Sequence, residues 1–192
     1  MVGTVRVLAD DLTGALDSAV RFTGEVGPLR VAWSKDAAGH AESLAFSSES
    51  RNLGEDAAIA RIRDCAAMLR PESDIAFKKI DSLLRGPIAA ELAAILAQGH
   101  FDAVILAPAF PALGRMTRLG RQWVRYSERA ELQIVGPDLA DDLARFGVLC
   151  HRSAEQLRAG ALPAVWLADA ESDDDLRRIV ATGRALSGRI LW

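Results

Sequence analysis

The sequence lacks the features that mark zinc-binding, secreted and membrane-spanning proteins. Its two cysteines, Cys65 and Cys150, lie far apart, and its three histidines form no H-x-x-x-H or His-Cys cluster, so no zinc site is indicated. No apolar run approaches the roughly 20 residues that a membrane-spanning helix requires, and the N-terminus has no apolar signal-peptide core. We therefore predict a cytoplasmic protein with reduced thiols, no metal site and no membrane partner.

The sequence also has no excess of basic residues. The 23 lysines and arginines face 26 aspartates and glutamates, and the formal charge of −3 leaves no basic surface for nucleic acid. No G-x-x-x-x-G-K-S/T or G-x-G-x-x-G motif follows a candidate strand, so no loop that cradles nucleotide phosphates is recognisable. The partners expected of this chain are small molecules.

Short apolar runs alternate with segments of helical periodicity along all 192 residues, half of which are hydrophobic. This alternation predicts an α/β fold, with a mostly parallel β-sheet flanked by helices on both faces. No repeat or Pro/Gly/Ser linker divides the chain, so we expect residues 1–192 to form one domain. The candidate strands are residues 4–9, 29–33, 43–47, 74–79, 103–107, 148–151, 164–168 and 189–192.

Helix boundaries are signalled by capping residues, prolines and glycines. The predicted boundaries are, in chain order, a capped start at Asn52 with Glu55, a start at Pro87 with a stop at Gly99, a helix from Pro137 to Phe146, a start at Ser153 with a stop at Gly160, and a start at Ser172. The three aspartates after Ser172 fit a positive helix end better than a metal site. The chain stops on the strand-like residues 189–192, so we expect it to be part of a longer protein.

Four polar clusters follow candidate strands, at residues 9–14, 47–51, 78–86 and 107–115. Ligands of open parallel sheets bind beyond the carboxyl ends of the strands, because loops and helix N-termini converge there. We therefore predict one polar site at one edge of one sheet.

The first cluster, ADDLTG, places Asp10 and Asp11 between a buried strand and a helix. One carboxylate can cap the helix while the other faces outward to accept hydrogen bonds from ligand hydroxyls, or both can serve only as caps. A third interpretation is a phosphatase with Asp10 as its nucleophile. That motif requires a second aspartate at position 12, which is Leu12 here.

The cluster KKIDSLLRG combines cations, a hydroxyl and a carboxylate. Lys78 and Lys79 point to opposite faces if they belong to a strand, so only one of them lines a given site. Ser82 and Arg85 suit an anion and Asp81 suits a sugar hydroxyl, although a salt bridge from Asp81 to Lys79 or Arg85 would also explain part of the cluster. Further along the chain, Arg115 follows a loop stiffened by two prolines, and Arg51 directly follows a strand; both arginines could reach an anion.

In this order, the segments ADDLTGALDSA, SESR, KKIDSLLRG and APAFPALGR resemble the N-terminal sugar-binding domain of the four-carbon acid sugar kinase family. Kinases of this family act on threonate, erythronate or 3-oxo-tetronate. The resemblance implies that the chain is the substrate-binding domain of an ATP-dependent kinase that phosphorylates a hydroxyl of a four-carbon sugar acid. ATP and Mg²⁺ would be held by a C-terminal domain that this chain lacks, so the chain alone would be inactive.

The resemblance implies substrate contacts by one aspartate of the pair Asp10 and Asp11, and by Arg51, Lys79, Ile80, Asp81 and Ser82. We add Arg85 and Arg115 as candidates. A sugar acid needs a cation for its carboxylate, for which Arg51 and Lys79 are the candidates, and Asp11 or Asp81 would orient or deprotonate the reacting hydroxyl. A non-catalytic sugar-acid binding module is the alternative from a different class, and association into a homo-oligomer is left open.

Overall fold

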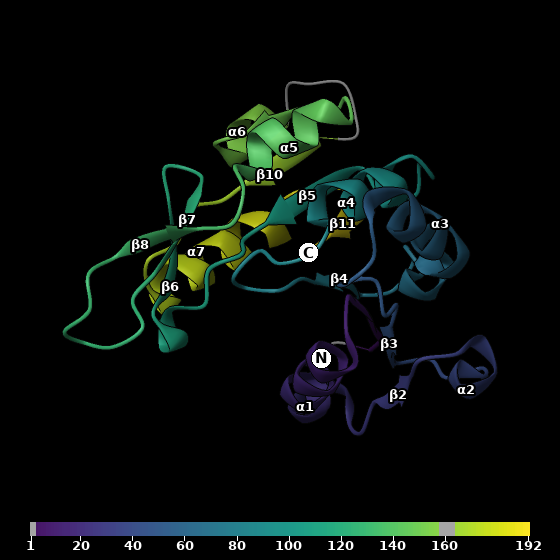
Figure 1. The fold of residues 1–192 in the computed structure, drawn as a ribbon. Helices are drawn as coiled ribbons and strands as arrows, with labels where there is room; N and C mark the ends of the chain where they lie inside the picture. Colours follow the sequence, from purple (N-terminus) through teal and green to yellow (C-terminus); the bar gives the residue numbers. More distant parts are fainter. Residues whose placement is uncertain (1–2, 158–163) are drawn as a thin grey trace. The chain divides into compact units, whose positions relative to one another are not determined.

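The structure is a computed structural model and describes residues 3–157 and 164–192 (Figure 1). The chain divides into two compact units that exchange short segments. The first unit comprises Met1–Asp81, Gly86–His100 and Leu191–Trp192, and the second comprises Ser82–Arg85 and Phe101–Ile190. Because the chain passes between the units several times, no single linker marks the division in the sequence.

The first unit is built on parallel strands in the order β2-β3-β1-β4, and Leu191 of β11 pairs in parallel with Ala76 on the free side of β4. Every strand of this unit lies within or next to a predicted segment. The elements are β1 (Val5–Ala9), α1 (Leu12–Val26), β2 (Arg30–Ala32), α2 (Lys35–Ala38), β3 (Leu44–Ser47), α3 (Glu55–Cys65), the 3-10 helix η1 (Ala66–Leu69), β4 (Ile75–Lys79), α4 (Ile88–Leu96) and β11 (Ile190–Leu191).

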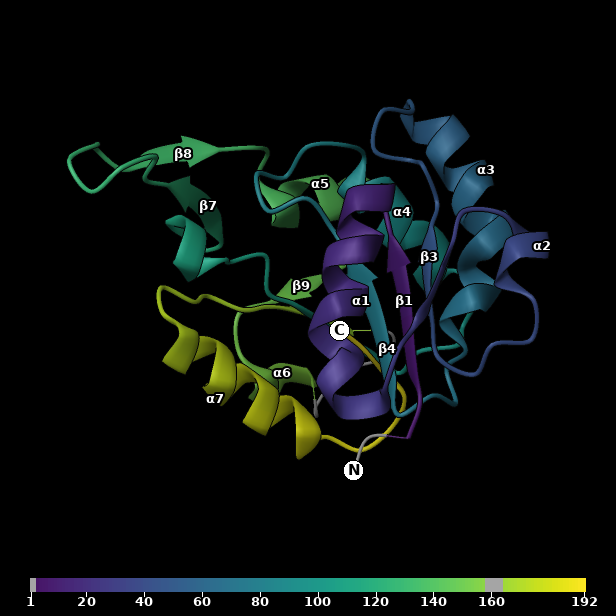
Figure 2. The ribbon, with the colours of Figure 1, turned by 90° about the horizontal axis from the view of Figure 1, so that it is seen from below.

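Helices cover both faces of this sheet (Figure 2). On one face, Ala15 and Ala19 of α1 pack against the fully buried strand β1, and Phe22 meets Phe77 of β4 edge to face. On the other face, Lys78 of β4 pairs with Glu91 of α4. The opposite directions of Phe77 and Lys78 follow from the two-residue period of a strand, so the predicted split between Lys78 and Lys79 is confirmed.

Two predicted helix starts need correction. Helix α3 begins at Glu55 with Gly54 as its N-cap and no side-chain cap, so the capping box at Asn52 is wrong. The reason is a turn before the helix, in which the Leu53 N–H donates to the Ser50 carbonyl at 3.0 Å. Pro87 was predicted as the first residue of its helix. It is instead the N-cap of α4, which begins one residue later at Ile88.

The second unit contains parallel strands in the order β5-β10-β9 and an antiparallel sheet in the order β6-β7-β8. The antiparallel sheet was not predicted. Ser172 caps α7 as expected, whereas the predicted stop at Gly160 lies outside the described residues. The elements are β5 (Ala103–Leu106), the 3-10 helix η2 (Pro111–Leu113), β6 (Arg115–Arg118), β7 (Arg121–Val124), β8 (Gln133–Val135), α5 (Leu139–Arg145), β9 (Cys150–His151), α6 (Ala154–Leu157), β10 (Ala164–Leu167) and α7 (Asp173–Arg184).

The predicted fold class, α/β with a mostly parallel sheet, is confirmed. In the described part of the chain, no helix has both the length and the apolar character needed to cross a bilayer.

Candidate functional site

The first part of the site is the sharp passage from β1 into α1. Asp11 is the N-cap of α1, and its Oδ1 accepts a hydrogen bond from the Gly14 N–H at 2.7 Å. A Cβ at position 14 would lie 2.8 Å from that oxygen and 3.3 Å from Cγ of Lys79, so any larger residue would displace the capping carboxylate or the Lys79 side chain. Asp11 therefore fulfils the predicted capping role, with its second oxygen directed away from the helix.

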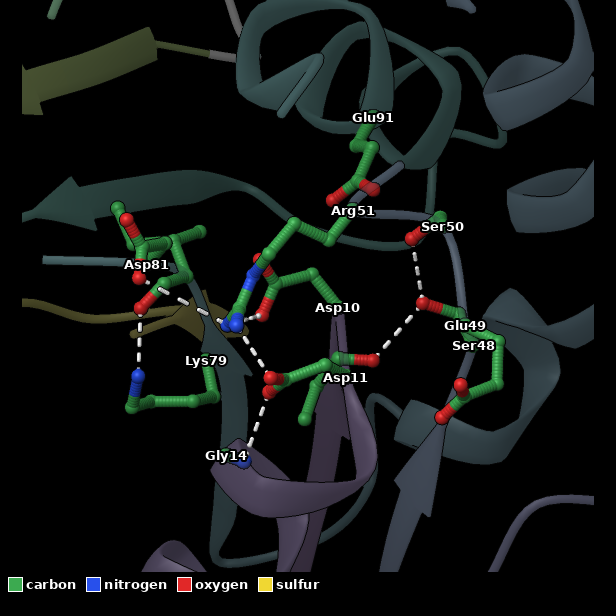
Figure 3. A network of polar contacts seen from close by, with 12 residues as sticks. Asp10, Asp11, Gly14, Ser48, Glu49, Ser50, Arg51, Lys79, Asp81 and Glu91 are labelled. Atoms are coloured by element: carbon green, nitrogen blue, oxygen red, sulfur yellow. Dashed lines mark hydrogen bonds and ion pairs between the residues drawn. The ribbon is translucent and has the colours of Figure 1, made fainter. Parts of the chain in front are cut away.

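Arg51 connects both aspartates of this passage (Figure 3). Its Nε and Nη2 donate to the two carboxylate oxygens of Asp10 at 2.8 and 2.9 Å, and its Nη1 donates to Oδ2 of Asp11. Asp10 is buried, with 2% of its surface exposed. The expectation that one aspartate caps the helix while the other faces outward is therefore wrong for Asp10, because a bidentate arginine pair takes up its carboxylate.

A turn after β3 brings Arg51 to the end of β1. The Ser48 N–H donates to the Ala9 carbonyl at 2.8 Å, and the N–H groups of Ser50 and Arg51 donate to the Asp10 carbonyl at 3.0 and 3.1 Å. The Ser48 hydroxyl also donates to Ala9 and contacts the Ser50 hydroxyl at 2.6 Å. These backbone bonds explain why Arg51 is held against Asp10 rather than solvated.

Strand β4 supplies the remaining groups. Lys79 points toward α1, and its Nζ donates to the Ile80 carbonyl at 2.6 Å. Asp81 is buried, and its Oδ1 lies 3.9 Å from Nη2 of Arg51. Asp10, Asp11, Arg51, Lys79 and Asp81 therefore gather at the carboxyl ends of β1 and β4 and beside the turn that follows β3; we call these five residues the aspartate cluster.

Burial and charge act in opposite directions on the two cations of the aspartate cluster. Burial lowers the pKa of Lys79, and the positive charge of Arg51 adds to that effect, while Asp10, Asp81 and Asp11 partly offset it. For Arg51, burial alone would lower the pKa, but the hydrogen bonds and charges of Asp10 and the charges of Asp11 and Asp81 raise it above its ordinary value. Arg51 is therefore firmly cationic, and the cluster contains more carboxylates than cations.

Three further candidates lie in the second unit. Nη1 of Arg115 donates to the Ser82 hydroxyl, and Nε2 of Gln122 donates to the carbonyls of Ser82 and Pro108 at 2.9 and 3.2 Å. Arg85 is exposed. The structure thus unites Asp10, Asp11, Arg51, Lys79, Ile80 and Asp81 in one unit, and Ser82 with Arg115 in the other.

The sequence analysis did not predict a partner for Lys78. Glu91 is the one charged residue of α4, and it forms a 2.6 Å ion pair with Lys78 in which both side chains are 1% exposed. A lone acid in an otherwise apolar helix was the available signal. Within the described residues, no group of three or more His, Cys, Asp or Glu side chains is arranged to hold a metal ion.

The fold and the aspartate cluster define a class of protein: an α/β domain with a polar cluster at the carboxyl ends of its parallel strands, where ligands of such folds bind. A family model described as "Sugar-binding N-terminal domain" matches residues 5–142. The chain therefore belongs to the sugar-binding N-terminal domain family, which confirms its resemblance to the four-carbon acid sugar kinases.

Two curated relatives are both called D-threonate kinase. The chain is 38% identical to the protein from Bordetella bronchiseptica over 62% of this chain and 32% of that protein. It is 32% identical to the protein from Cupriavidus necator over 95% of this chain and 43% of that protein. The chain thus spans less than half the length of these relatives.

A solved structure has the same fold. It is a domain of unknown function from Bordetella bronchiseptica, described as a domain-swapped dimer with bound citrate. Its TM-score to this chain is 0.71 at 25% sequence identity, and the match covers all of this chain and 54% of that one.

Proposed function

We propose that the chain is the substrate-binding domain of an ATP-dependent kinase that phosphorylates a hydroxyl of a four-carbon sugar acid, with D-threonate as the first candidate. The observation that carries the proposal is the aspartate cluster, in which carboxylates from two strand ends gather around Arg51 and Lys79. The curated relatives called D-threonate kinase support it. The citrate of the related structure is itself a hydroxylated carboxylate.

Binding a sugar acid requires hydrogen-bond acceptors for its hydroxyl groups and a cation for its carboxylate. Asp11 and Asp81 provide oxygens that hold hydroxyl groups, and either of them orients or deprotonates the hydroxyl that receives phosphate. Such a base contributes about 10²-fold to 10⁴-fold, because phosphoryl transfer depends mainly on positioning and charge neutralisation. The Lys79 ammonium group lies in the aspartate cluster and donates to the Ile80 carbonyl at 2.6 Å, and it is the cation we assign to the substrate carboxylate.

The sequence contains no recognisable phosphate-cradling glycine motif. We therefore assign ATP and Mg²⁺ to a C-terminal nucleotide-binding domain of the whole protein, and we propose that this chain alone transfers no phosphate. A cytoplasmic location and a homo-oligomeric state belong to the same proposal.

The phosphatase alternative finds no support in the geometry. A nucleophilic Asp10 would need a carboxylate oxygen open to the substrate, whereas both of its oxygens accept hydrogen bonds from Arg51.

Calorimetric titration of the chain with D-threonate, erythronate and ribonate tests the proposal. We expect heat with at least one four-carbon acid and its loss in Asp11→Asn. Asp17→Asn is the matched control, because Asp17 is an exposed acid on the same helix. Absence of heat with all three acids would refute the proposal, and equal binding by the two variants would remove Asp11 from the site. Phosphate transfer by the whole protein distinguishes the kinase from a non-catalytic binding module.

A further inference from the structure

Arg51 is already engaged by the protein itself. Each of its three guanidinium nitrogens contacts an aspartate, two of them forming a bidentate pair with Asp10 and the third reaching Asp11. A substrate carboxylate that formed the same bidentate contact with Arg51 would have to displace the buried Asp10 carboxylate and leave it without its cation. That exchange is costly, because an unpaired buried charge loses hydration without compensation.

We propose that Arg51 is a positioning residue that holds Asp10 and Asp11 in place as part of a hydroxyl-binding site, and that Gly86 holds Arg51. The inference rests on the proposed function for the identity of the ligand. The role of Arg51 is therefore to fix the carboxylates that the hydroxyls meet, and it makes no contact with the acid group of the substrate.

Gly86 lies against the backbone of Arg51. A Cβ at position 86 would lie 2.9 Å from the Arg51 carbonyl oxygen and 3.2 Å from its Cα. These are backbone atoms, so no side-chain rotation relieves the clash. Gly86 also has φ +89°, which disfavours every other residue type. Gly86 is the first residue of the first unit after Ser82–Arg85, so it brings the chain back directly onto Arg51.

The charge balance supports recognition of hydroxyls. Asp10, Asp11 and Asp81 lie around Arg51, which pairs with all three of these acids. A carboxylate oxygen has more than one lone pair, so an oxygen that already accepts from Arg51 can also accept a hydrogen bond from a hydroxyl. The ligand class that the cluster recognises is therefore a vicinal polyol, whether or not it carries a carboxylate.

The first experiment compares D-threonate with D-threitol, the neutral tetritol of the same configuration, in calorimetric titrations of the chain and its Arg51→Met variant. A residue that only positions Asp10 and Asp11 must affect both ligands, so we expect both affinities to fall by a similar factor, about tenfold or more. A loss confined to D-threonate would show that Arg51 binds the carboxylate and would overturn the inference.

The Arg51→Lys variant separates the same alternatives. Lysine keeps the charge but cannot form the planar two-point contact with Asp10, so we expect it to lose affinity as Arg51→Met does. Selective recovery of D-threonate binding by Arg51→Lys would contradict a positioning role.

A second experiment needs no ligand. The Gly14 amide donates to Asp11, so its nuclear magnetic resonance signal reports on the position of that carboxylate. We expect Arg51→Met and Gly86→Ala to shift the signal. Gly27→Ala is the matched control, because Gly27 has φ +76° but no atom lies within 4 Å of a Cβ at this position, and we expect it to leave the Gly14 signal unchanged.

The two proposals fail separately. If the wild-type chain binds neither ligand, the proposed function fails, and the Gly14 signal still decides whether Arg51 and Gly86 hold Asp11. An unshifted signal in both Arg51→Met and Gly86→Ala would overturn the inference even where D-threonate binds.

Discussion

Consecutive lysines at the end of β4 have separate roles because their side chains leave opposite faces of the sheet. Lys79 belongs to the aspartate cluster, whereas Lys78 and Glu91 form an ion pair closed off from solvent. Apart from this ion pair, Glu91 has no hydrogen-bond partner for its carboxylate oxygens among the described residues. The energetic value of such a pair depends on whether one or both partners are removed.

Removing Glu91 alone should destabilise the protein strongly. We expect Glu91→Ala to cost about 3–5 kcal/mol of unfolding free energy, because Lys78 is left buried and unpaired. The double variant Lys78→Met with Glu91→Leu should recover most of that loss, since apolar side chains of similar volume fill the same space. Urea unfolding measures both. Equal losses in the single and double variants would show that packing, and not charge, dominates at this position.

At the scale of single elements, α7 is the helix whose start is best defined by its own sequence. The Ser172 hydroxyl accepts from the Asp175 N–H at 3.2 Å, and the Asp175 carboxylate accepts from the Ser172 N–H at 2.9 Å. The Ser172 hydroxyl, the backbone N–H of Glu171 and the side chain of Arg178 help to lower the pKa of Asp175 to about 2. All of these groups favour the ionised form.

This capping box predicts a pH dependence. The depressed pKa means that the contribution of Asp175 to stability is present above the ordinary carboxyl pKa of about 4. It is lost as the pH falls through about 2. We expect Ser172→Ala to cost about 1 kcal/mol at pH 7 and to raise the pKa of Asp175, measured by nuclear magnetic resonance titration. An unchanged pKa in Ser172→Ala would show that the other donors hold the carboxylate.

The parallel strands could be predicted from the sequence, whereas the antiparallel strands could not. All eight segments predicted as strands contain one, because their apolar runs and helical neighbours specify parallel pairing. The strands β6, β7 and β8 were missed, since their turn lacks an Asn-Gly signal. Leu119 and Gly120 both have positive φ, and the Asp169 carboxylate holds their N–H groups at 2.7 and 2.8 Å. Asp169 is distant from this turn in the sequence, so no local sequence pattern predicts these hydrogen bonds.

The residues that gather in the aspartate cluster could be predicted from the sequence, but their pairing could not. The strand-end clusters that contribute Asp10, Arg51 and Asp81 were recognisable, because parallel strands end at a shared edge. The pairing of Arg51 with Asp10 was not, since it depends on backbone bonds from Ser50 and Arg51 to the end of β1. Sequence patterns identify which residues meet, and only the structure shows which charges they neutralise.

At the scale of the whole molecule, the first unit is completed by residues that come after the whole second unit in the chain. Leu191 is fully buried beside Ala76, and the Lys78 N–H and Ala76 carbonyl both pair with Trp192, at 2.6 and 2.9 Å. These contacts make the stability of the first unit depend on residues 191–192.

Truncation of the Leu191 side chain tests that dependence. We expect Leu191→Ala to cost about 2–5 kcal/mol, because it opens a cavity beside β4. Leu149→Ala is the control: Leu149 is 69% exposed. We expect that variant to change the unfolding free energy by less than about 0.5 kcal/mol in urea. Similar costs for the two substitutions would show that β11 adds little to the first unit.

The late pairing of β4 also affects how the protein is made. During translation, the backbone groups of Lys78 and Ala76 that later pair with Trp192 have no partner until the ribosome has synthesised residue 192. A nascent chain therefore carries an open strand edge while the whole second unit emerges, and open edges invite pairing with other chains. The edge of β4 is therefore the part of the first unit that we expect to be most open to wrong pairing during synthesis.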